Sequence, residues 1–244
     1  MNLGQAAAVT AAGFAAGGVN TIVGSGSLIT FPTLLAVGYP SVVANVSNSV
    51  GLIPGGISGA IGYRRELQGQ WRRTGILAVG TGLGALLGGV LLLVLPSSVF
   101  DAVVPALILL AVVLMALKRT PAQHADKDNI VGGSVASFTT GIYGGYFGAA
   151  QGIILMSLLR LTFPDDLQRL NAVKIVLTAV ANGVATVLFI FAADVAWEAA
   201  GLIAAGSIVG AQVAARYGRA IPSEVLRWIV VVGGAIVAVI LIIT

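Results

Sequence analysis

The sequence predicts an all-α integral membrane protein made of two inverted-topology repeats. Each repeat is expected to contain a broken, re-entrant helical hairpin followed by three transmembrane helices. The first observation is composition: of 244 residues, 57% are hydrophobic and 9% are charged, with a mean hydropathy of +1.00. Soluble domains carry about 25% charged residues. The second is a pair of apolar stretches interrupted by glycine-rich polar segments, and the third is a match between the two halves of the chain.

Six segments have the length of about 20 apolar residues that a transmembrane helix needs. They are 41–63, 74–95, 99–117, 170–193, 199–215 and 225–243. Two further apolar segments, 4–36 and 130–160, are too long for one simple span and are interrupted within 17–27 and 141–152. No basic residue precedes the first of these, so we expect it to be a retained membrane segment and not a cleaved signal peptide.

The two halves match when the sequence is shifted by 126 residues. "GTGLGA" at 80–85 then overlays "GSIVGA" at 206–211, and the two interrupted segments nearly coincide. The matched pairs are Asn45 with Asn171, Trp71 with Trp197, Gly80 with Gly206, and Gly84 with Gly210. Internal repeats are common in secondary transporters. We therefore predict a first repeat at 1–117, a cytoplasmic linker at 118–129 and a second repeat at 130–244.

The distribution of basic residues predicts that the two repeats have opposite orientations. If each interrupted segment enters the membrane and returns to the same side of it, four loops face the cytoplasm. These loops are 64–73, 118–128, 160–169 and 216–227. These loops hold 12 of the 13 Lys and Arg residues, as the positive-inside rule requires. Simple alternation of eight spans would instead place two of these loops outside. The sequence thus predicts a multi-pass protein of a bacterial plasma (inner) membrane with both termini outside.

Polar residues recur at helical spacing on one face of segment 170–193. This face carries Asn171, Lys174, Thr178 and Asn182, and Asn45 and Asn48 occupy the corresponding face in the first half. In an inverted repeat, two such faces are expected to meet near the membrane midplane. An alternative left open by the sequence is that Lys174 extends along its helix to the cytoplasmic interface.

The two interruptions predict a site for a small anion. A helix that restarts after a break presents unpaired N–H groups and the positive end of its dipole, which favour anions. The ammonium group of Lys174 would add a positive charge. The expected substrate-binding residues are Ser25, Gly26, Ser27, Asn45, Asn48, Gln151, Gly152, Asn171, Lys174, Thr178 and Asn182. Close helix packing is the alternative explanation for the glycines, and it is the preferred one for Gly80, Gly84 and Gly88.

Other classes of function find little support in the residues. The chain has no Cys, and its one His, His124, lies in a charged loop, so neither a metal site nor a Ser–His pair is indicated. No P-loop motif is present. The sequence pI is about 9.8. We attribute this value to basic residues in loops beside membrane spans and not to nucleic-acid binding. We expect no enzymatic activity, no cofactor and no nucleic-acid partner.

Several motifs together resemble the TauE/SafE sulfite exporter family, also called the 4-toluene sulfonate uptake permease family. They are "GGVNTIVGSGSLITFPTLLAVGYPSVVANVSNSV", "GIYGGYFGAAQGIILMSLLRL", the run containing Asn171, Lys174 and Asn182, and the later Trp197 and "GSIVGA". The resemblance implies transport of small sulfur oxyanions and organosulfonates. Members often carry a glycine triplet after the first break, which here reads Gly24-Ser25-Gly26-Ser27, while the second copy is read as 149–152.

The expected function is therefore membrane transport of a small sulfur-containing anion, sulfite or an organosulfonate, in the outward direction of an exporter. The anion would bind near the midplane between the two repeats. The partners would be this anion and the lipid bilayer. The sequence does not decide whether the chain forms a homo-oligomer. The alternatives are a passive small-anion channel and a membrane scaffold that transports nothing.

Overall fold

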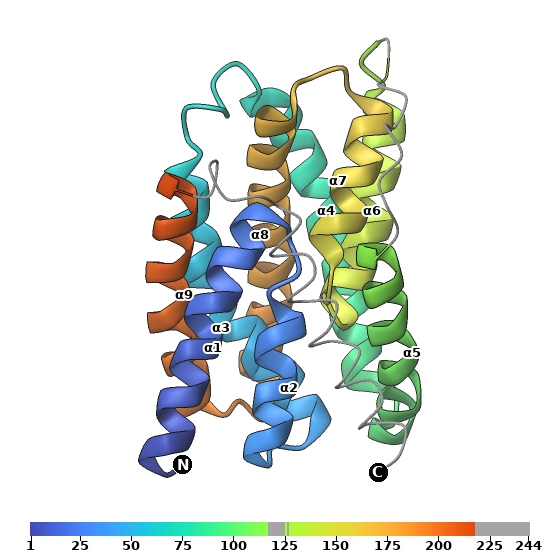
Figure 1. Cartoon of the computed structure of the whole chain (residues 1–244). Coiled ribbons are helices and arrows are strands. Elements are labelled where there is room, and N and C mark those ends of the chain that lie inside the picture. Colours follow the sequence, from blue (N-terminus) through green and yellow to red (C-terminus); the bar gives the residue numbers. More distant parts are fainter. Residues whose placement is uncertain (117–124, 126, 218–244) are drawn as a thin grey trace.

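The computed structural model describes residues 1–116, 125 and 127–217, and within these ranges it contains helices and no β-strand. The helices lie side by side along one common direction (Figure 1). Their bounds are α1 Leu3–Ile22, α2 Ser27–Val37, α3 Ser41–Gly62, α4 Trp71–Val94, α5 Ser97–Ala116, α6 Ile130–Tyr146, α7 Gln151–Thr162, α8 Leu167–Ala192 and α9 Trp197–Tyr217. The all-α prediction is confirmed for this part of the chain. The expected span 225–243 lies outside the described residues.

Five of the expected spans correspond to the helices α3, α4, α5, α8 and α9. By length and composition, α4, α8 and α9 are long and apolar enough to cross a membrane. Helix α3 has 22 residues but carries a run of polar side chains buried inside the protein, among them Asn45 and Asn48. Its polar face therefore points to the protein interior, where a polar side chain finds partners that lipid cannot offer.

Both interrupted segments are broken helices, as the sequence predicts. The chain turns between α1 and α2 at Gly24, with φ +92°, and between α6 and α7 at Gly148, with φ +75°. The N–H of Gly24 donates to Val19 O at 2.9 Å, and the N–H of Gly148 donates to Tyr143 O at 3.0 Å. A bond reaching five residues back closes a helix C-terminus through a residue in the left-handed region, which glycine adopts without strain.

The number of residues that separates corresponding helices of the two halves is not constant. Helices α3 and α8 begin 126 residues apart, at Ser41 and Leu167, whereas α2 and α7 begin 124 residues apart, at Ser27 and Gln151. Helix α7 and the loop after it are together two residues longer than their counterparts. Counted from the helix starts, the segment that corresponds to 24–27 is 148–151, one residue earlier than the sequence reading of 149–152.

Each half supplies a helix that packs closely on a broken helix of the other half. Helix α4 lies along α6, and α9 lies along α1. A Cβ atom on Gly84 would come within 2.1 Å of Phe138 O, and one on Gly210, its match in the second half, within 1.9 Å of Phe14 O. The predicted packing role of Gly84 and Gly88 is confirmed, because only glycine permits such close approach of the backbones, and a Cβ atom on Gly80 would lie 3.2 Å from Ser134 O.

The loops gather at two ends of the helix bundle. The chain N-terminus and the loops 38–40 and 193–196 lie at one end, and the loops 63–70 and 163–166 lie at the other (Figure 1). Helix α1 thus begins, and helix α2 finishes, at the first of these ends. Helix α6 begins, and helix α7 finishes, at the second. Which end faces the cytoplasm stays a prediction from the positions of the basic residues.

Candidate functional site

The two breaks touch each other in the interior of the protein. The N–H of Gly152, at the start of α7, donates to Gly24 O at 3.0 Å. A Cβ atom on either glycine would lie 2.6 Å from the Cα of the other. Residues from four helix ends therefore meet at one point, and only glycine fits at both positions of the contact.

Lys174 on α8 is completely buried in the protein. Its side chain is 0% exposed, and its Nζ donates to Asn20 O in the last turn of α1 at 3.2 Å. The last carbonyl groups of a helix carry the negative end of its dipole, which favours a cation. The broken end of α1 therefore offsets part of the cost of burying the ammonium group, and the alternative of an extended Lys174 at the interface is excluded.

The side chains of Asn171 and Asn45 make equivalent hydrogen bonds in opposite halves. The Nδ2 of Asn171 donates to Thr21 O, at the end of α1, at 3.1 Å. The Nδ2 of Asn45 donates to Tyr146 O, at the end of α6, at 3.0 Å. Each amide satisfies a carbonyl group at the broken helix of the other half, which has no partner within its own helix. Both residues therefore hold the halves together at the breaks.

Asn48, the counterpart of Lys174, stays within the first half. Its Nδ2 donates to the Oγ of Ser27 at 3.1 Å, and its Oδ1 accepts a hydrogen bond from the hydroxyl group of Thr30. The side chains of Asn171 and Lys174 on α8 donate instead to carbonyl groups at the end of α1. The two polar faces are connected through the breaks.

Three polar atoms near the breaks are buried without a hydrogen-bond partner among the described residues. They are Ser25 Oγ, Gln151 Nε2 and Asn45 Oδ1. Ser25 is 1% exposed and Gln151 is 3% exposed. A buried polar atom without a partner costs about 1–3 kcal/mol, and such atoms in native proteins are few. Ser25 and Gln151 belong to the two breaks, and Asn45 bonds to the end of α6 through its other amide atom.

The remaining expected site residues have other surroundings. The Cα of Gly26 faces α1, where a Cβ atom would come within 2.4 Å of Ala16 O. Packing therefore explains this glycine, and a larger residue would clash. The hydroxyl group of Thr178 donates to Lys174 O at 3.0 Å, within its own helix. Asn182 is partly exposed, two turns beyond Lys174.

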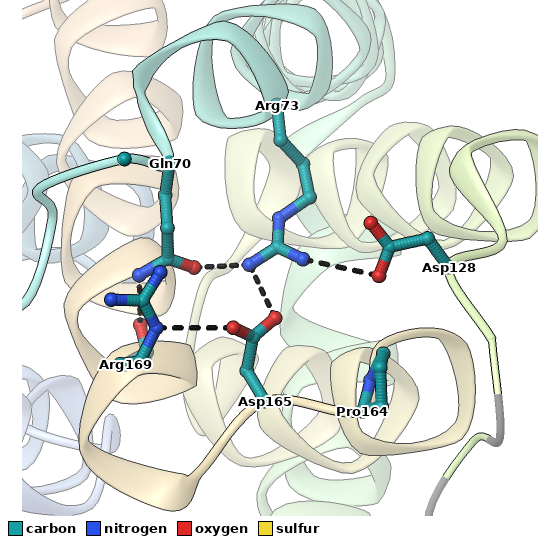
Figure 2. Close-up of a pocket in the computed structure, with 7 residues that line it drawn as sticks. Gln70, Arg73, Asp128, Pro164, Asp165 and Arg169 are labelled. Atoms are coloured by element: carbon teal, nitrogen blue, oxygen red, sulfur yellow. Dashed lines mark hydrogen bonds and ion pairs between the residues drawn. The ribbon is translucent and has the colours of Figure 1, made fainter.

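A second polar cluster lies at the end of the bundle formed by loops 63–70 and 163–166. Figure 2 shows Arg73 directed toward Asp165 and Asp128, with Nη2 2.6 Å from Asp165 Oδ2 and Nη1 3.5 Å from Asp128 Oδ1. Arg169 reaches the other oxygen of Asp165 at 3.0 Å. The guanidinium group of Arg73 also lies 4.4 Å above the ring of Phe163. Opposite charges are matched here, so the cluster joins the start of α4 to the loop before α8.

This cluster borders a pocket of about 260 Å³. The pocket is lined by Gly69, Gln70, Arg73, Asp128, Pro164, Asp165 and Arg169. Its two arginines are both paired with carboxylates. Sequence reasoning placed these residues in cytoplasmic loops and assigned them no role.

Comparison with known proteins decides the family. The family model described as "Sulfite exporter TauE/SafE" matches residues 9–241. The chain belongs to the TauE/SafE sulfite exporter family. It is thus a multi-pass membrane protein of a transporter family, as its motifs predict. No solved structure matches the chain.

Three relatives align with most of the chain. A "Probable membrane transporter protein" of Haemophilus influenzae is 29% identical over 209 residues, which is 84% of this chain and 81% of the relative. "Probable membrane transporter protein ORF9" of a Sinorhizobium species is 27% identical over 225 residues, 91% and 86%. "Probable membrane transporter protein YfcA" of Escherichia coli K12 is 23% identical over 226 residues, 91% and 84%.

Sequence reasoning on the TauE/SafE motifs missed Asn20. This residue lies within the glycine-rich segment 17–27, but under the shift of 126 residues it falls on Tyr146 and not on another amide, so the repeat gave no reason to single it out. Its backbone oxygen accepts from Lys174 and its Oδ1 accepts from the N–H of Gly26 at 2.7 Å. A polar residue in the last turn of an apolar helix, four residues before the glycine at the break, was the available signal.

Proposed function

We propose that this chain transports small sulfur-containing anions, sulfite or an organosulfonate, and that it exports them. The anion would bind between the two halves near the membrane midplane, at the contact of the two breaks. Membership of a transporter family supports transport and argues against an enzyme. The anion, the direction and the site are the proposal.

The observation that carries the proposed site is the set of unsatisfied polar atoms beside a buried cation. Ser25 Oγ and Gln151 Nε2 are buried and unpartnered among the described residues, and both belong to the breaks that touch at Gly24 and Gly152. Helices α2 and α7 begin there, so the positive ends of two helix dipoles point to the same place. The ammonium group of Lys174, bonded to Asn20 O, adds a full charge nearby.

The proposal includes the inverted relation of the halves. Reciprocal packing supports it: α4 on α6 matches α9 on α1, and α3 on α9 matches α8 on α4. The bonds from Asn45 to Tyr146 and from Asn171 to Thr21 are reciprocal in the same way. Two halves with opposite orientation around one site are a plan that allows alternating access.

The orientation in the membrane is testable because the chain has no Cys. Asp194 lies in the loop before α9 and Gln168 at the start of α8, and both side chains are exposed. We expect a cysteine introduced at Asp194 to react with an impermeant thiol reagent added outside the cell. A cysteine introduced at Gln168 should react only after the membrane is opened. The reverse pattern would refute the proposed orientation.

The transported anion is tested with purified protein. Thermal stability in detergent would be measured with sulfite, sulfate, thiosulfate, taurine and sulfoacetate, and calorimetry would give the affinity of those that stabilise. We expect sulfite or a sulfonate to stabilise, and proteoliposomes to release it. Absence of binding and of flux for every sulfur anion would refute the proposal. Flux that ignores a pH gradient at fixed voltage would favour a passive channel instead.

A further inference from the structure

Asn20 connects the buried cation to the start of α2. It lies in the last turn of α1, where its backbone oxygen accepts the hydrogen bond from Lys174 Nζ at 3.2 Å. Its side-chain Oδ1 accepts from the N–H of Gly26, the residue before α2, at 2.7 Å. One residue thus contacts both elements of the proposed anion site.

The orientation of the Asn20 amide is fixed by this second bond. An amide group carries an acceptor oxygen and a nitrogen with two donors, and the N–H of Gly26 requires the oxygen. The Cγ of Asn20 also lies so close to Gly26 that a Cβ atom there would approach it to 2.9 Å. The two N–H donors of Nδ2 therefore point away from Gly26.

These two donors are open to a ligand. Among the described residues no hydrogen bond from Asn20 Nδ2 is formed, and the atom is not one of the fully buried unpartnered ones. The Asn20 side chain is partly exposed although Val19 and Thr21 beside it are buried. Asn20 is therefore not fully enclosed by the residues around it.

The second half carries a different amide at its own break. The counterpart of Asn20, counted from the breaks, is Gly144, where a Cβ atom would lie 2.4 Å from Gln151 Cδ. The side chain of Gln151 thus fills the place that a side chain at 144 would take. Its Nε2 is buried and unpartnered among the described residues. One amide donor comes from the end of α1, and another from the start of α7.

We propose that Asn20 is a specificity-determining residue that donates hydrogen bonds to the bound anion while it holds the start of α2. This inference rests on the proposed anion transport. Its Nδ2 would bind one anion oxygen, Gln151 Nε2 another, and the charge would be balanced by Lys174. The arrangement favours an anion with several oxygen acceptors, because each neutral donor needs its own oxygen.

The test replaces the donors and keeps the acceptor. In Asn20→Asp, a carboxylate oxygen still accepts from Gly26, but the two N–H donors are lost and a negative charge faces the ligand. We expect the affinity for sulfite and sulfoacetate in calorimetry to fall at least about 100-fold. The affinity for taurine should fall much less, because its ammonium group is attracted to the introduced carboxylate. Misfolding would instead weaken the binding of all three compounds equally.

The matched control is Asn129→Asp. Asn129 is an exposed residue that caps α6 by accepting from the N–H of Gly132 at 2.8 Å, and Asp caps a helix as well as Asn. It should leave the affinities unchanged. If Asn20→Asp does not give folded protein, Asn20→Ser replaces it, with an expected loss of about tenfold for sulfite.

The outcomes separate this inference from the proposed function. If the unaltered protein binds no sulfur anion, the proposed function fails and this inference fails with it. If it binds sulfite and the Asn20 variants bind with the same affinity, only the role of Asn20 is refuted. An equal loss for sulfite, sulfoacetate and taurine would also refute it, since that result assigns Asn20 a structural role alone.

Discussion

Asn48 and Lys174 occupy matching positions in the two halves, but their side chains have different partners. Asn48 bonds to Ser27 and Thr30 within its own half. Lys174 reaches across to Asn20, at the broken end of α1. The same position on the central helix thus carries a neutral amide that stabilises one half, and a cation that faces the other. A repeated scaffold can therefore hold a single charge without a matching charge in its partner half.

The neighbouring pair behaves in the opposite way. Asn45 and Asn171 keep the same residue type and make reciprocal bonds to the ends of α6 and α1. These two positions stabilise the contact between the halves, to which each half contributes in the same way. Where the halves agree, the residues stabilise the fold, and where they differ, as at positions 48 and 174, we expect the ligand.

The largest effect is expected at the contact of the breaks. Gly152→Ala would place a Cβ atom 2.6 Å from Gly24 Cα and 2.9 Å from Gly24 O. Backbone atoms cannot move aside as side chains do, so we expect a loss of about 3 kcal/mol in the free energy of unfolding, with loss of anion binding. Thermal unfolding in detergent measures the first and calorimetry the second.

Gly183→Ala is the matched control for this clash. Gly183 lies within α8, and a Cβ atom there would meet nothing within 4 Å. Alanine favours the helix over glycine by about 1 kcal/mol, so this variant should be as stable as the parent protein or more so. Equal destabilisation by Gly152→Ala and Gly183→Ala would show that the breaks are not packed against each other.

The next effect concerns Lys174 and separates binding from stability. In Lys174→Met the cation is replaced by an apolar side chain of similar length. The replacement removes the donor to Asn20 O together with the desolvation cost of the buried ammonium group, so we expect the unfolding free energy to fall by no more than about 1–3 kcal/mol. The affinity for the anion should fall about 100-fold, since a charged hydrogen-bond partner is lost.

Two variants control the Lys174 result. Lys127→Met alters an exposed lysine in the segment before α6 and should leave the affinity unchanged. Lys174→Arg keeps the charge and should retain more affinity than Lys174→Met. If Lys174→Met bound the anion as tightly as the parent protein, Lys174 would serve only the end of α1 and the proposed site would be wrong.

Asn45→Ala and Asn171→Ala should have smaller effects that equal each other. Each leaves one carbonyl group at a broken helix end without its side-chain donor, at an expected cost of about 1–3 kcal/mol in unfolding free energy. Asn182→Ala is the control, because Asn182 makes no side-chain hydrogen bond among the described residues, and it should cost less than about 0.5 kcal/mol. A clear difference between Asn45→Ala and Asn171→Ala would contradict the reciprocal role.

The sequence predicts the helices well and the contacts between them poorly. The segment 41–63 is found as α3, Ser41–Gly62, and 170–193 as α8, Leu167–Ala192. Helix α8 begins earlier than its apolar run because the side chain of Asp166 caps it by accepting from the N–H of Gln168 and of Arg169. Hydropathy marks the part of a helix inside lipid and does not mark such capped ends.

The site could be predicted only in part for a related physical reason. Helical spacing places Asn171 and Lys174 on one face, and the structure buries both. Their partners are carbonyl groups of Thr21 and Asn20, which every residue type carries, so no pattern of side chains points to them. The insertion of two residues between the starts of α7 and α8 also moved the second break out of the register that the repeat predicts.

The smallest effect is expected at the polar cluster at the end of the bundle, and it tests whether that cluster joins the halves. Asp165 contacts both Arg73 and Arg169, and its side chain is 18% exposed, while Asp128 is 58% exposed and 3.5 Å from Arg73. Water screens the exposed pair, so Asp128→Asn should change the unfolding free energy by less than about 0.3 kcal/mol and Asp165→Asn by about 1 kcal/mol. A double-mutant cycle of Asp165→Asn with Arg73→Gln would isolate the pair and should give a coupling of about 0.5 kcal/mol or more. Equal effects of the two Asp→Asn variants would mean that burial does not strengthen the pair. The cluster would then add nothing to the contact between the halves that the breaks provide.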